Sequence, residues 1–502
     1  MIRRVKPQPI ENYIFPLKKY LRDFPSFHDK IALQQTKDER KVIPMEIISQ
    51  KQRNFEREIK NLNLKAKFDN TNVTSVATFS YVELFKRIIG YNGILKNTLS
   101  YKKATNSTFT AVDVIDYLTD ANILGFSRFS HTTDLKDDLG YQKIKGTDRL
   151  PSEKVCRDLL KTLPVEVLKE LRNINKQILE IKSLTEEVRE ICINIDDTVI
   201  TIFGNQEGSA VGYNPRYHGR PSFKEKVGFI AGTNELLDIT LESGKHHSNY
   251  EFLEFFKNCT SQLPKRYILK RVRLDRGFFD EKNFLYFENE GIEYVAKSKM
   301  LSTVKMIISY MNNNPKDYTW NPISSQFDTT EITIPLPKWE KARRFVMVRE
   351  RLQPKFDKKQ LMFEELMYNY EVIVTNIDYL TPEEIFHEYN QRCDVENKID
   401  EVKEGYAFSE NSMLNHKANE LYLLIKMIAF NISNWFKQAV LPIEVQHHEI
   451  DTLRRIFYKV TGNICGNGAY RHLSFAPNEK LQMIIEFINK KILCFSRRLC
   501  IT

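Results

Sequence analysis

The hydrophobic pattern of this chain changes its period near residue 186. Between residues 73 and 185, apolar residues recur every three or four positions, as in YVELFKRII and VEVLKELRNI, which places them on one face of a helix. The next stretch, ICINIDDTVITIFG, alternates apolar and polar residues and is rich in β-branched side chains, which predicts a strand. The chain therefore has to join a helical region to a β-sheet.

Further strands and helices follow this first strand. A Gly-Thr-Asn turn divides KVGFIAGTNELLDITLESG into two predicted strands. Predicted helices then alternate with predicted strands in the order NYEFLEFFKNCTSQL, RYILKRVRL, DEKNFLYFEN and GIEYVAKSK, and NYEVIVTNI is a later strand. Strands in direct succession, followed by strands that alternate with helices, are typical of an α/β domain on a mixed sheet.

Composition narrows the class of protein. The chain of 502 residues is long enough for two or three domains, and its formal net charge of +10 is compatible with a polyanionic partner. Seven cysteines without a Cys-x-x-Cys pair argue against a zinc site and favour reduced thiols. The first residues lack the apolar core of a signal peptide, and no apolar run approaches the length of a membrane span. We expect a cytoplasmic protein without a membrane partner.

One predicted helix carries an unusual set of polar groups. Thr381 fits its N-cap, Pro382 its first position and Glu384 its capping box, and Gly405 fits its end. In a continuous helix, a stripe about 60° wide holds four functional side chains, those of Tyr389, Arg392, Glu396 and Lys403.

This stripe has an ordinary interpretation as well as a functional one. Val395, Ile399 and Val402 lie beside it and can anchor the helix to a sheet. Arg392 and Glu396 are four residues apart, a spacing that contributes only a few tenths of a kcal/mol as a helix ion pair. The helix alone therefore favours a solvated face, and the choice between the two interpretations depends on residues elsewhere in the chain.

Two more carboxylates favour the functional interpretation. Asp196 lies in the strand INIDDTV, and Asp275 ends the strand RYILKRVRLD before a turn at Gly277. With Glu396 they offer three hard oxygen ligands, which suit Mg²⁺ or Mn²⁺. A pair of such ions can activate an attacking oxygen and stabilise a leaving one during phosphodiester displacement.

These residues carry a family resemblance. DDTV, LDRGFF and the pattern Y-x2-R-x3-E-x6-K resemble the DDE-class insertion-sequence transposases of bacteria, in the branch with the Y-R-E-K signature. QEGSAVGYNPRYHGRPSF and the helical segment after residue 72 extend the resemblance. Residues 1–72 do not share it, and their role stays open.

The resemblance implies an α/β fold with an RNase H-like mixed sheet, a β-rich insertion, and helical N- and C-terminal regions. It divides the chain into six parts: a basic segment at 1–72, a helical DNA-binding domain at 73–185, the first part of the catalytic core at 186–300, the β-rich insertion at 301–369, the second part of the core with the acidic helix at 370–440, and a helical region at 441–502.

Residue roles follow by matching motif positions. The resemblance implies that Asp196, Asp275 and Glu396 form the catalytic, metal-binding triad. Asp197 is a rival for the first position, but the Asp-x-Thr pattern favours Asp196. Three further residues would bind DNA, with Arg392 and Lys403 as phosphate clamps and Tyr389 as a nearby support.

A long loop between two predicted strands is a second candidate for DNA contact. NQEGSAVGYNPRYHGRPSFKEK, residues 205–226, is far longer than a hairpin requires. It is either a surface loop or a segment whose bases face phosphates, namely Arg216, Arg220, Lys224 and Lys226. Trp320 and Trp339, in the proposed insertion, could stack on an unpaired base, although a packing role is the more frequent one for tryptophan.

The sequence thus predicts a DDE transposase that cuts and joins DNA at the ends of its own insertion sequence. Its expected partners are the terminal inverted repeats, target DNA and a second copy of the chain in a homodimer, and its expected location is the bacterial nucleoid. Three alternatives stay open: a nuclease or resolvase of the same fold without strand transfer, a non-catalytic DNA-binding descendant, and a zinc-based regulator.

Overall fold

The computed structural model describes Arg53 and residues 69–352, 368–392, 398–466 and 471–501. The predicted ligand Glu396, its neighbour Val395 and most of the basic segment 1–72 lie outside these residues. The chain divides into two compact units, Met1–Asn70 and Thr71–Thr502. Every strand and every multi-residue helix among the described residues belongs to the second unit.

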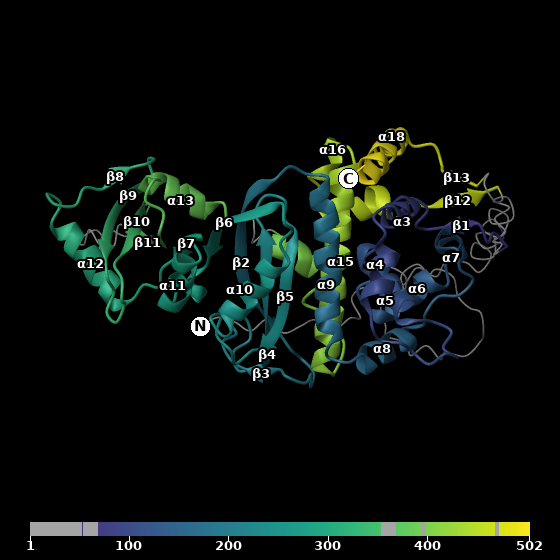
Figure 1. Cartoon of the computed structure of the whole chain (residues 1–502), viewed down its shortest axis with the longest axis horizontal. Coiled ribbons are helices and arrows are strands. Elements are labelled where there is room, and N and C mark those ends of the chain that lie inside the picture. Colours follow the sequence, from purple (N-terminus) through teal and green to yellow (C-terminus); the bar gives the residue numbers. More distant parts are fainter. Residues whose placement is uncertain (1–52, 54–68, 353–367, 393–397, 467–470, 502) are drawn as a thin grey trace, which may run out of the picture. The chain divides into compact units, whose positions relative to one another are not determined.

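The centre of this unit is a mixed sheet (Figure 1). Strands β2 (Arg189–Thr201), β4 (Pro221–Ile230) and β5 (Leu236–Ser243) are antiparallel neighbours in the order β5-β4-β2. On the other side of β2, β6 (Tyr267–Leu274) is parallel to it, and β7 (Glu293–Lys297) is parallel to β6. Three antiparallel strands followed by two parallel ones confirm the predicted RNase H-like sheet.

Four more strands continue this sheet: β11 (Tyr368–Thr375), which matches the predicted core strand NYEVIVTNI, and three strands within the predicted insertion. Strand β11 is antiparallel to β7, and β10 (Arg343–Arg351) is antiparallel to β11. β9 (Phe327–Ile334) pairs with β10, and β8 (Asn321–Pro322) ends the series. The described strands of the predicted insertion are thus joined by main-chain hydrogen bonds to β11, and through β11 to β7.

Strand β7 shows how the two faces of the sheet are covered. Tyr294 and Ala296 belong to a buried cluster with Phe284 of α11 (Glu281–Asn289), and the same cluster includes residues of α10 (Phe252–Ser261). Val295, between them, belongs to a different cluster that includes residues of α13 (Pro382–Asn390). Successive side chains of a strand point to opposite faces, so α11 and α13 cover opposite faces of β7.

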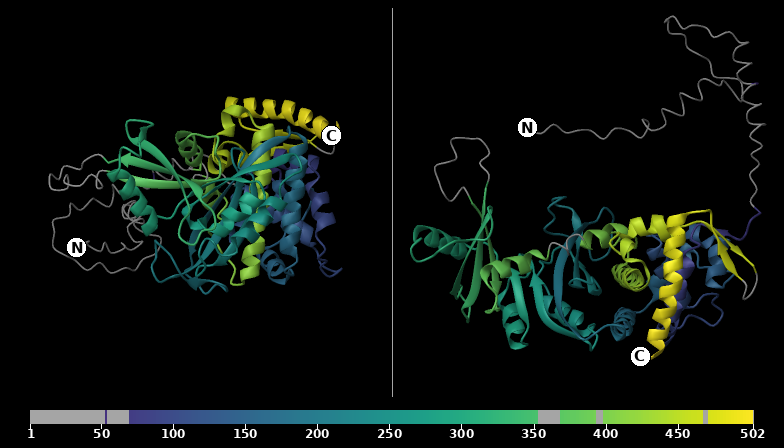
Figure 2. Two further views of the ribbon diagram at one scale, coloured as in Figure 1. Left: turned by 60° about the vertical axis from the view of Figure 1, so that its left-hand side comes forward. Right: turned by 90° about the horizontal axis from the view of Figure 1, so that it is seen from above.

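Helices from distant parts of the chain meet at α15 (His416–Val440) (Figures 1 and 2). Helix α15 contacts α3 (Phe79–Ile88), α5 (Ala111–Ile123), α9 (Val167–Leu184) and strand β5. It also contacts α8 (Glu153–Thr162), which precedes the sheet in the sequence, and α18 (Glu479–Ile501), which follows it. Nearly every residue from Leu421 to Phe436 of α15 is buried. Among the described helices, none is both long and apolar enough to span a bilayer.

Shorter elements complete the described structure. They are β1 (Val73–Thr74), α4 (Tyr91–Thr98), η2 (Phe129–His131), α6 (Thr132–Lys136), α7 (Leu139–Lys145), β3 (Ala210–Val211), η3 (Arg276–Phe278), α12 (Ser302–Asn313), η5 (Glu401–Gly405), α16 (Ile443–Gln446), α17 (Ile450–Leu453), η6 (Arg454–Tyr458), β12 (Gly462–Cys465) and β13 (His472–Ser474). The strands β1, β12 and β13 form a separate sheet.

The predicted polar helix begins as expected but ends early. The capping box is present, since the Glu384 N–H donates to Thr381 Oγ1 at 3.2 Å and the Thr381 N–H donates to Glu384 Oε2 at 2.8 Å. The helix α13 then ends at Asn390, with Gln391 and Arg392 in a turn. The prediction of one continuous helix to residue 404 is therefore wrong.

Packing explains this early end. Ile385 and Tyr389 of α13 are buried in a cluster with β7, β10 and β11. Ile399 and Val402 are buried in the separate cluster that contains α15. The two apolar sets thus belong to different buried clusters, whereas the prediction assigned them to one face of a single helix.

Gly405 fits its position because of a close contact. Its φ is not positive, so the predicted left-handed helix end is not what places glycine there. A Cβ at position 405 would lie 2.3 Å from Cγ2 of Ile450 in α17. The segment is further fixed by Arg454, whose Nη1 donates to the Gly405 carbonyl at 2.6 Å. Glycine therefore lets η5, which carries Lys403, dock on α17.

This contact yields a prediction about stability. We expect Gly405→Ala to lower the free energy of unfolding by about 1–3 kcal/mol, as overpacking a filled core does. Gly93→Ala is the matched control, because no atom lies within 4 Å of its added Cβ in α4, and alanine should stabilise that helix by about 0.5–1 kcal/mol. Urea unfolding of the three proteins measures both effects, and equal stability of the two variants would contradict the packing account.

Candidate active site

Two of the predicted ligands come together at the edge where β2 and β6 are paired. The strands are parallel, and Asn194 is paired with Arg273 and Ile195 with Leu274. Asp196 and Asp275 are the next residues on the two strands. Asp275 leaves β6 and begins the turn at η3. Neighbouring parallel strands thus place two carboxylates side by side.

Asp196 is a buried carboxylate with a cationic partner. Burial raises its pKa to about 6, while the positive charge of Arg392 and a main-chain hydrogen bond oppose this rise. Arg392 Nη2 lies 2.7 Å from Asp196 Oδ2, and both side chains are largely buried. The Asp197 N–H donates to Asp196 Oδ1 at 2.8 Å. The negative charge of Asp275 also raises the pKa of Asp196, which agrees with the proximity of the two acids.

Arg392 reaches the strand from the end of α13. Its N–H donates to the Tyr389 carbonyl at 2.9 Å. The Tyr389 ring is buried among residues of β7 and β10, and burial raises its pKa. Lys297 Nζ lies 5.9 Å from the centre of this ring. Tyr389 thus holds the turn that presents Arg392 to Asp196.

A network that the sequence analysis missed fixes the same helix end. Arg273 of β6 donates to Glu388 Oε1 of α13 at 2.6 and 3.0 Å and to Gln391 Oε1 at 2.6 Å. Arg271, two residues earlier, lies 2.8 Å from Glu388. The available signal was the Arg-Val-Arg spacing, because residues two apart on a strand share a face.

Asp197 has a different environment from Asp196. Its Oδ2 lies 3.3 Å from Lys224 Nζ of β4. Alternation along β2 turns Asp197 away from the face of Asp196. Asp196, and not Asp197, is therefore the acid that contacts Arg392.

Lys403 lies in η5 and is partly exposed. Its Nζ is 3.8 Å from Asp400 Oδ1. Its charge also acts on Glu225 of β4, a carboxylate that is 1% exposed. The described contacts thus place Lys403 near the β4 side of the sheet, and none of them joins it to Asp196.

Glu225 and Lys426 form an unusual buried pair of titratable groups. Burial raises the pKa of Glu225 to about 8, against the attraction of Lys426 and Lys403. Burial likewise lowers the pKa of Lys426 to about 8. Among the described residues, Glu225 Oε1 has no hydrogen-bond partner. Both groups therefore favour their neutral forms more than they would in water.

The long basic loop is shorter than predicted. Strand β4 begins at Pro221, so Lys224 and Lys226 are strand residues rather than loop residues. Lys226 is fully buried and its Nζ lies 2.6 Å from Glu242 Oε1. The expectation that both lysines face phosphates is wrong, because they share the covered face of β4. Arg216 and Arg220 remain in the exposed loop.

The two tryptophans of the predicted insertion are partly buried and pack against side chains. Trp339 lies 5.3 Å from the ring of Phe279 and 5.8 Å from that of Phe284. Trp320 lies 6.0 Å from the ring of Tyr370 and 4.5 Å from the guanidinium of Arg349. These contacts favour the packing interpretation.

One acidic cluster in the helical region competes with the strand acids as a metal site. Among the described residues, the only group of three potential metal ligands is Glu83, Asp116 and Asp120. Lys145 Nζ lies 2.5–2.9 Å from all three, and Lys86 Nζ contacts the same carboxylates. Two ammonium groups already balance most of the charge, so this cluster is explained as a buried ion-pair network.

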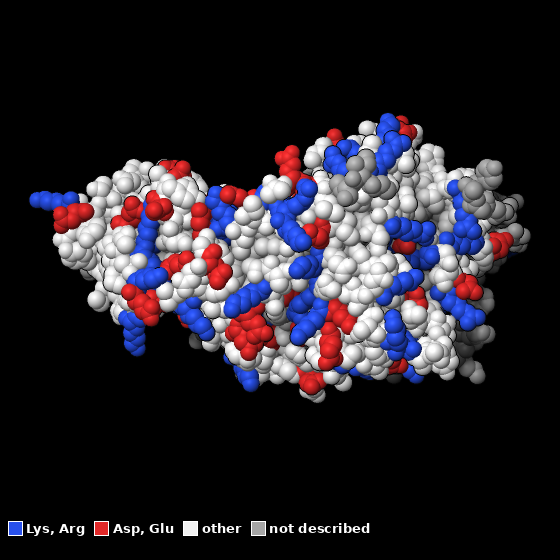
Figure 3. Space-filling model, viewed as in Figure 1, with Lys and Arg blue, Asp and Glu red and all other residues white. Residues whose placement is uncertain are grey.

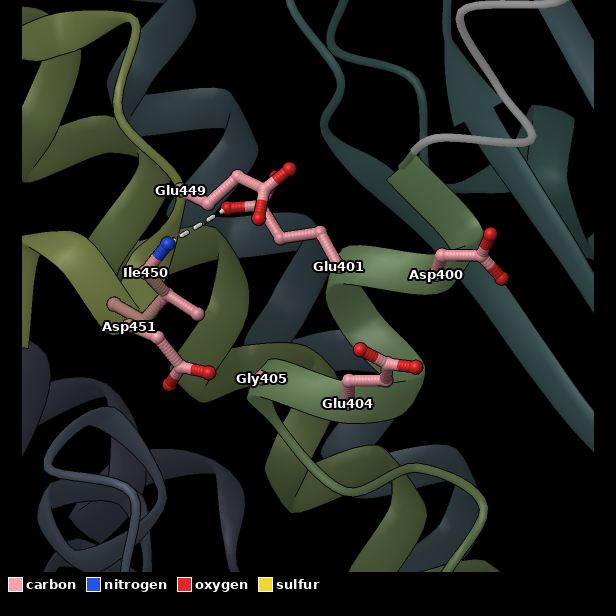
Figure 4. A pocket seen from close by; sticks show the side chains of 7 residues that line it. All are labelled: Asp400, Glu401, Glu404, Gly405, Glu449, Ile450 and Asp451. Atoms are coloured by element: carbon pink, nitrogen blue, oxygen red, sulfur yellow. Dashed lines mark hydrogen bonds between the residues drawn. The ribbon is translucent and has the colours of Figure 1, made fainter.

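A second acidic feature is a pocket of about 230 Å³ beside η5 (Figure 4). Its lining includes five carboxylates, those of Asp400, Glu401, Glu404, Glu449 and Asp451. Several are engaged: the Ile450 N–H donates to Glu401 Oε1 at 3.1 Å, as Figure 4 shows, and Arg454 lies 2.7 Å from Asp451. Such an acidic surface is unfavourable for a phosphate group.

Charge on the molecular surface is mixed. On the face drawn in Figure 3, lysine and arginine side chains are interspersed with aspartate and glutamate. The chain has a net charge of +10, but the basic side chains of the described residues form no single broad patch on that face.

The chain belongs to a transposase family. The family model Transposase DDE domain group 1 matches residues 56–494, and the protein is a DDE transposase. This family catalyses DNA cleavage and strand transfer and uses a divalent metal ion.

Two solved structures are similar to the chain. One is the piggyBac transposase synaptic complex with hairpin DNA, at 13% identity over 84% of each chain and a TM-score of 0.40. The other is the Drosophila P element transposase strand transfer complex, at 11% identity over 45% of this chain and 51% of that chain, with a TM-score of 0.21. No curated protein sequence matches the chain.

The buried Glu225 gives a prediction about pH. A carboxyl whose folded pKa is raised to about 8 stabilises the folded state fully below its unfolded pKa, near 4.3, and loses that contribution as pH rises through about 8. We therefore expect the unfolding free energy to fall more steeply between about pH 5 and pH 8 in the wild type than in Glu225→Gln.

Urea unfolding across this pH range provides the measurement. Glu254→Gln is the control, since Glu254 is an exposed residue of α10, and it should keep the wild-type slope. Parallel pH profiles for the wild type and Glu225→Gln would show that Glu225 is ionised in the folded state at pH 5.

Proposed function

We propose that this transposase cleaves DNA at the ends of its own insertion sequence and joins the freed 3′ ends to target DNA, using Asp196, Asp275 and Glu396. The observation that carries the proposal is the position of Asp196 and Asp275 directly after the last paired residues of the parallel strands β2 and β6. Arg392, from the Y-R-E-K pattern, contacts the first of these acids. We also propose that the chain belongs to the Y-R-E-K branch of these transposases.

The donor set suits a hard divalent cation. Asp196 and Asp275 offer carboxylate oxygens, and we assign the third to Glu396, four residues after Arg392. Mg²⁺ or Mn²⁺, bound as a pair, would supply activation of the attacking oxygen and stabilisation of the leaving oxygen. Oδ2 of Asp196 accepts the Arg392 guanidinium, so the carboxylate would bind the cation through its remaining acceptor positions, or through Oδ2 once Arg392 moves to a phosphate.

Arg392 has a second task once it is released. A guanidinium can grip a phosphate through two donors, whereas the Lys403 ammonium acts as a compact charge. We assign both to the DNA backbone, with Tyr389 fixing the turn before Arg392. We assign Arg216 and Arg220, in the segment that follows β2, to DNA phosphates farther from Asp196. We assign the helices of residues 73–185 to the terminal repeats. A homodimer would hold two ends together.

The chemistry is tested by removing one carboxylate charge at a time. Asp196→Asn, Asp275→Asn and Glu396→Gln keep side-chain shape but lose an anionic ligand, so cleavage and joining should both fall by orders of magnitude. All three variants should fold and bind the element's ends, with Asp196→Asn the least stable of them because Arg392 loses its buried partner. The assay uses purified protein, Mg²⁺ and DNA from the flanks of its own gene, and a second reaction supplies ends that are already cut.

Asp197→Asn is the matched control for this series. Asp197 is adjacent to Asp196 but faces Lys224, so both reactions should stay within a few-fold of the wild-type rates. An Asp197→Asn protein as inactive as Asp196→Asn would overturn the choice of first ligand. A wild-type protein that cleaves but never joins would favour the nuclease alternative.

A second prediction concerns the phosphate clamps. Each phosphate contact releases counterions, so Arg392→Ala and Lys403→Ala should each reduce the slope of log binding constant against log salt by about one unit. Lys270→Ala is a suitable control because this lysine, on β6, is paired with Glu190. Filter binding or anisotropy at several salt concentrations gives the slopes, and an unchanged slope in both variants would return these residues to a structural role.

A further inference from the structure

Three exposed aromatic residues follow the end of β2 in the chain. Phe203, Tyr213 and Tyr217 are 66%, 75% and 48% exposed. All three belong to the segment that joins β2 to β4. Large aromatic side chains usually bury most of their surface, and exposed apolar patches mark interaction sites. Three exposed rings in the segment between β2 and β4 therefore indicate a surface that binds a partner.

The rings are held in place by the backbone beneath them. Asn214 is 2% exposed, and its Nδ2 donates to Thr201 Oγ1 at 2.9 Å. Its Oδ1 accepts the N–H groups of Arg216 and Tyr217 at 3.2 and 3.0 Å. The segment also lies directly on the end of β5, since a Cβ on Gly212 would be 1.8 Å from the Gly244 carbonyl oxygen. A partner would therefore meet a preorganised surface.

Cations accompany the rings. The Arg220 guanidinium lies 5.0 Å from the centre of the Phe203 ring, and the Tyr217 ring meets the Phe203 ring edge to face at 5.4 Å. Arg216 is exposed between them in sequence. The segment 202–220 contains one acidic residue, Glu207, and its carboxylate accepts from Asn415 and from the His416 N–H. The surface is thus aromatic and cationic, which complements a polyanion that carries flat apolar groups.

We propose that Phe203, Tyr213 and Tyr217 form a stacking platform for unpaired DNA bases, with Arg216 and Arg220 on the adjoining phosphates. Exposed aromatic faces stack on bases of any sequence, but only where those bases are not stacked in a duplex. The platform begins beyond Thr201, five residues after Asp196 along β2, which is about 17 Å at the rise of a strand. This inference rests on the proposed DNA cleavage and joining, because staggered cuts in the two strands leave unpaired bases beside the reacting phosphate.

The test measures stacking directly. Full-length protein without divalent cation is titrated into a single strand that contains 2-aminopurine, whose fluorescence is quenched on stacking. The triple variant Phe203→Ala, Tyr213→Ala, Tyr217→Ala should lose the quench and bind the strand about tenfold or more weakly, while its affinity for a blunt duplex changes less than about twofold. Tyr213→Phe should behave as wild type, because it keeps the ring.

Tyr310→Ala is the control for loss of an exposed aromatic ring. Tyr310 is 57% exposed on α12, and its removal should leave the quench intact. A triple variant that folds with the wild-type melting temperature and still quenches would overturn the platform. An equal loss of duplex and single-strand affinity would also overturn it, in favour of a general backbone contact. Since no cleavage occurs in this assay, a wild type that quenches but never cuts DNA would overturn only the proposed function.

Discussion

The ion pair between Asp196 and Arg392 is the interaction on which the candidate active site depends. A carboxylate in the middle of a sheet is costly to bury, and Arg392 at 2.7 Å offsets that cost. The pair also joins β2 to the end of α13, which the Arg273 network fixes to β6. Removing one partner would leave the other as an uncompensated buried charge. Asp196 on β2 and the turn at Arg392 therefore depend on each other electrostatically.

A shared hydrophobic core connects this edge to the helices of both chain ends. Helix α15 packs on β5 and on α3, α5 and α9, and residues of β2 and β4 belong to the same buried cluster as these helices. On the other side, β11 extends the sheet from β7. If the helices of residues 73–185 bind the terminal repeats, as proposed, the bound ends are fixed to the cluster that contains residues of β2 and β4, while the residues before Asp196 and Asp275 belong to a second cluster on the same strands.

The sequence predicted what depends on local pattern. Alternation located β2 and β6, and the capping box at Thr381 located the start of α13, because both signals lie within a few residues. The early end of α13, the burial of Lys226 and the Arg273 network were not predictable, since each depends on a partner far away in sequence: a second core, Glu242 and Glu388. Asp196 and Asp275 could be singled out as acids in or at the end of a strand, but their pairing required the parallel register of β2 and β6. Glu396 lies outside the described residues, and its role stays a prediction.

The central claim is that Asp196, Asp275 and Glu396 bind the metal ions that the reaction uses. Anomalous diffraction from crystals of the wild-type protein with Mn²⁺ and its terminal DNA tests it most directly. The account predicts a manganese peak within direct ligand distance, about 2.0–2.3 Å, of Asp196 and Asp275, with Glu396 as a further ligand and Arg392 moved from Asp196 to a DNA phosphate. A peak at Glu83, Asp116 and Asp120 with none between β2 and β6 would contradict it.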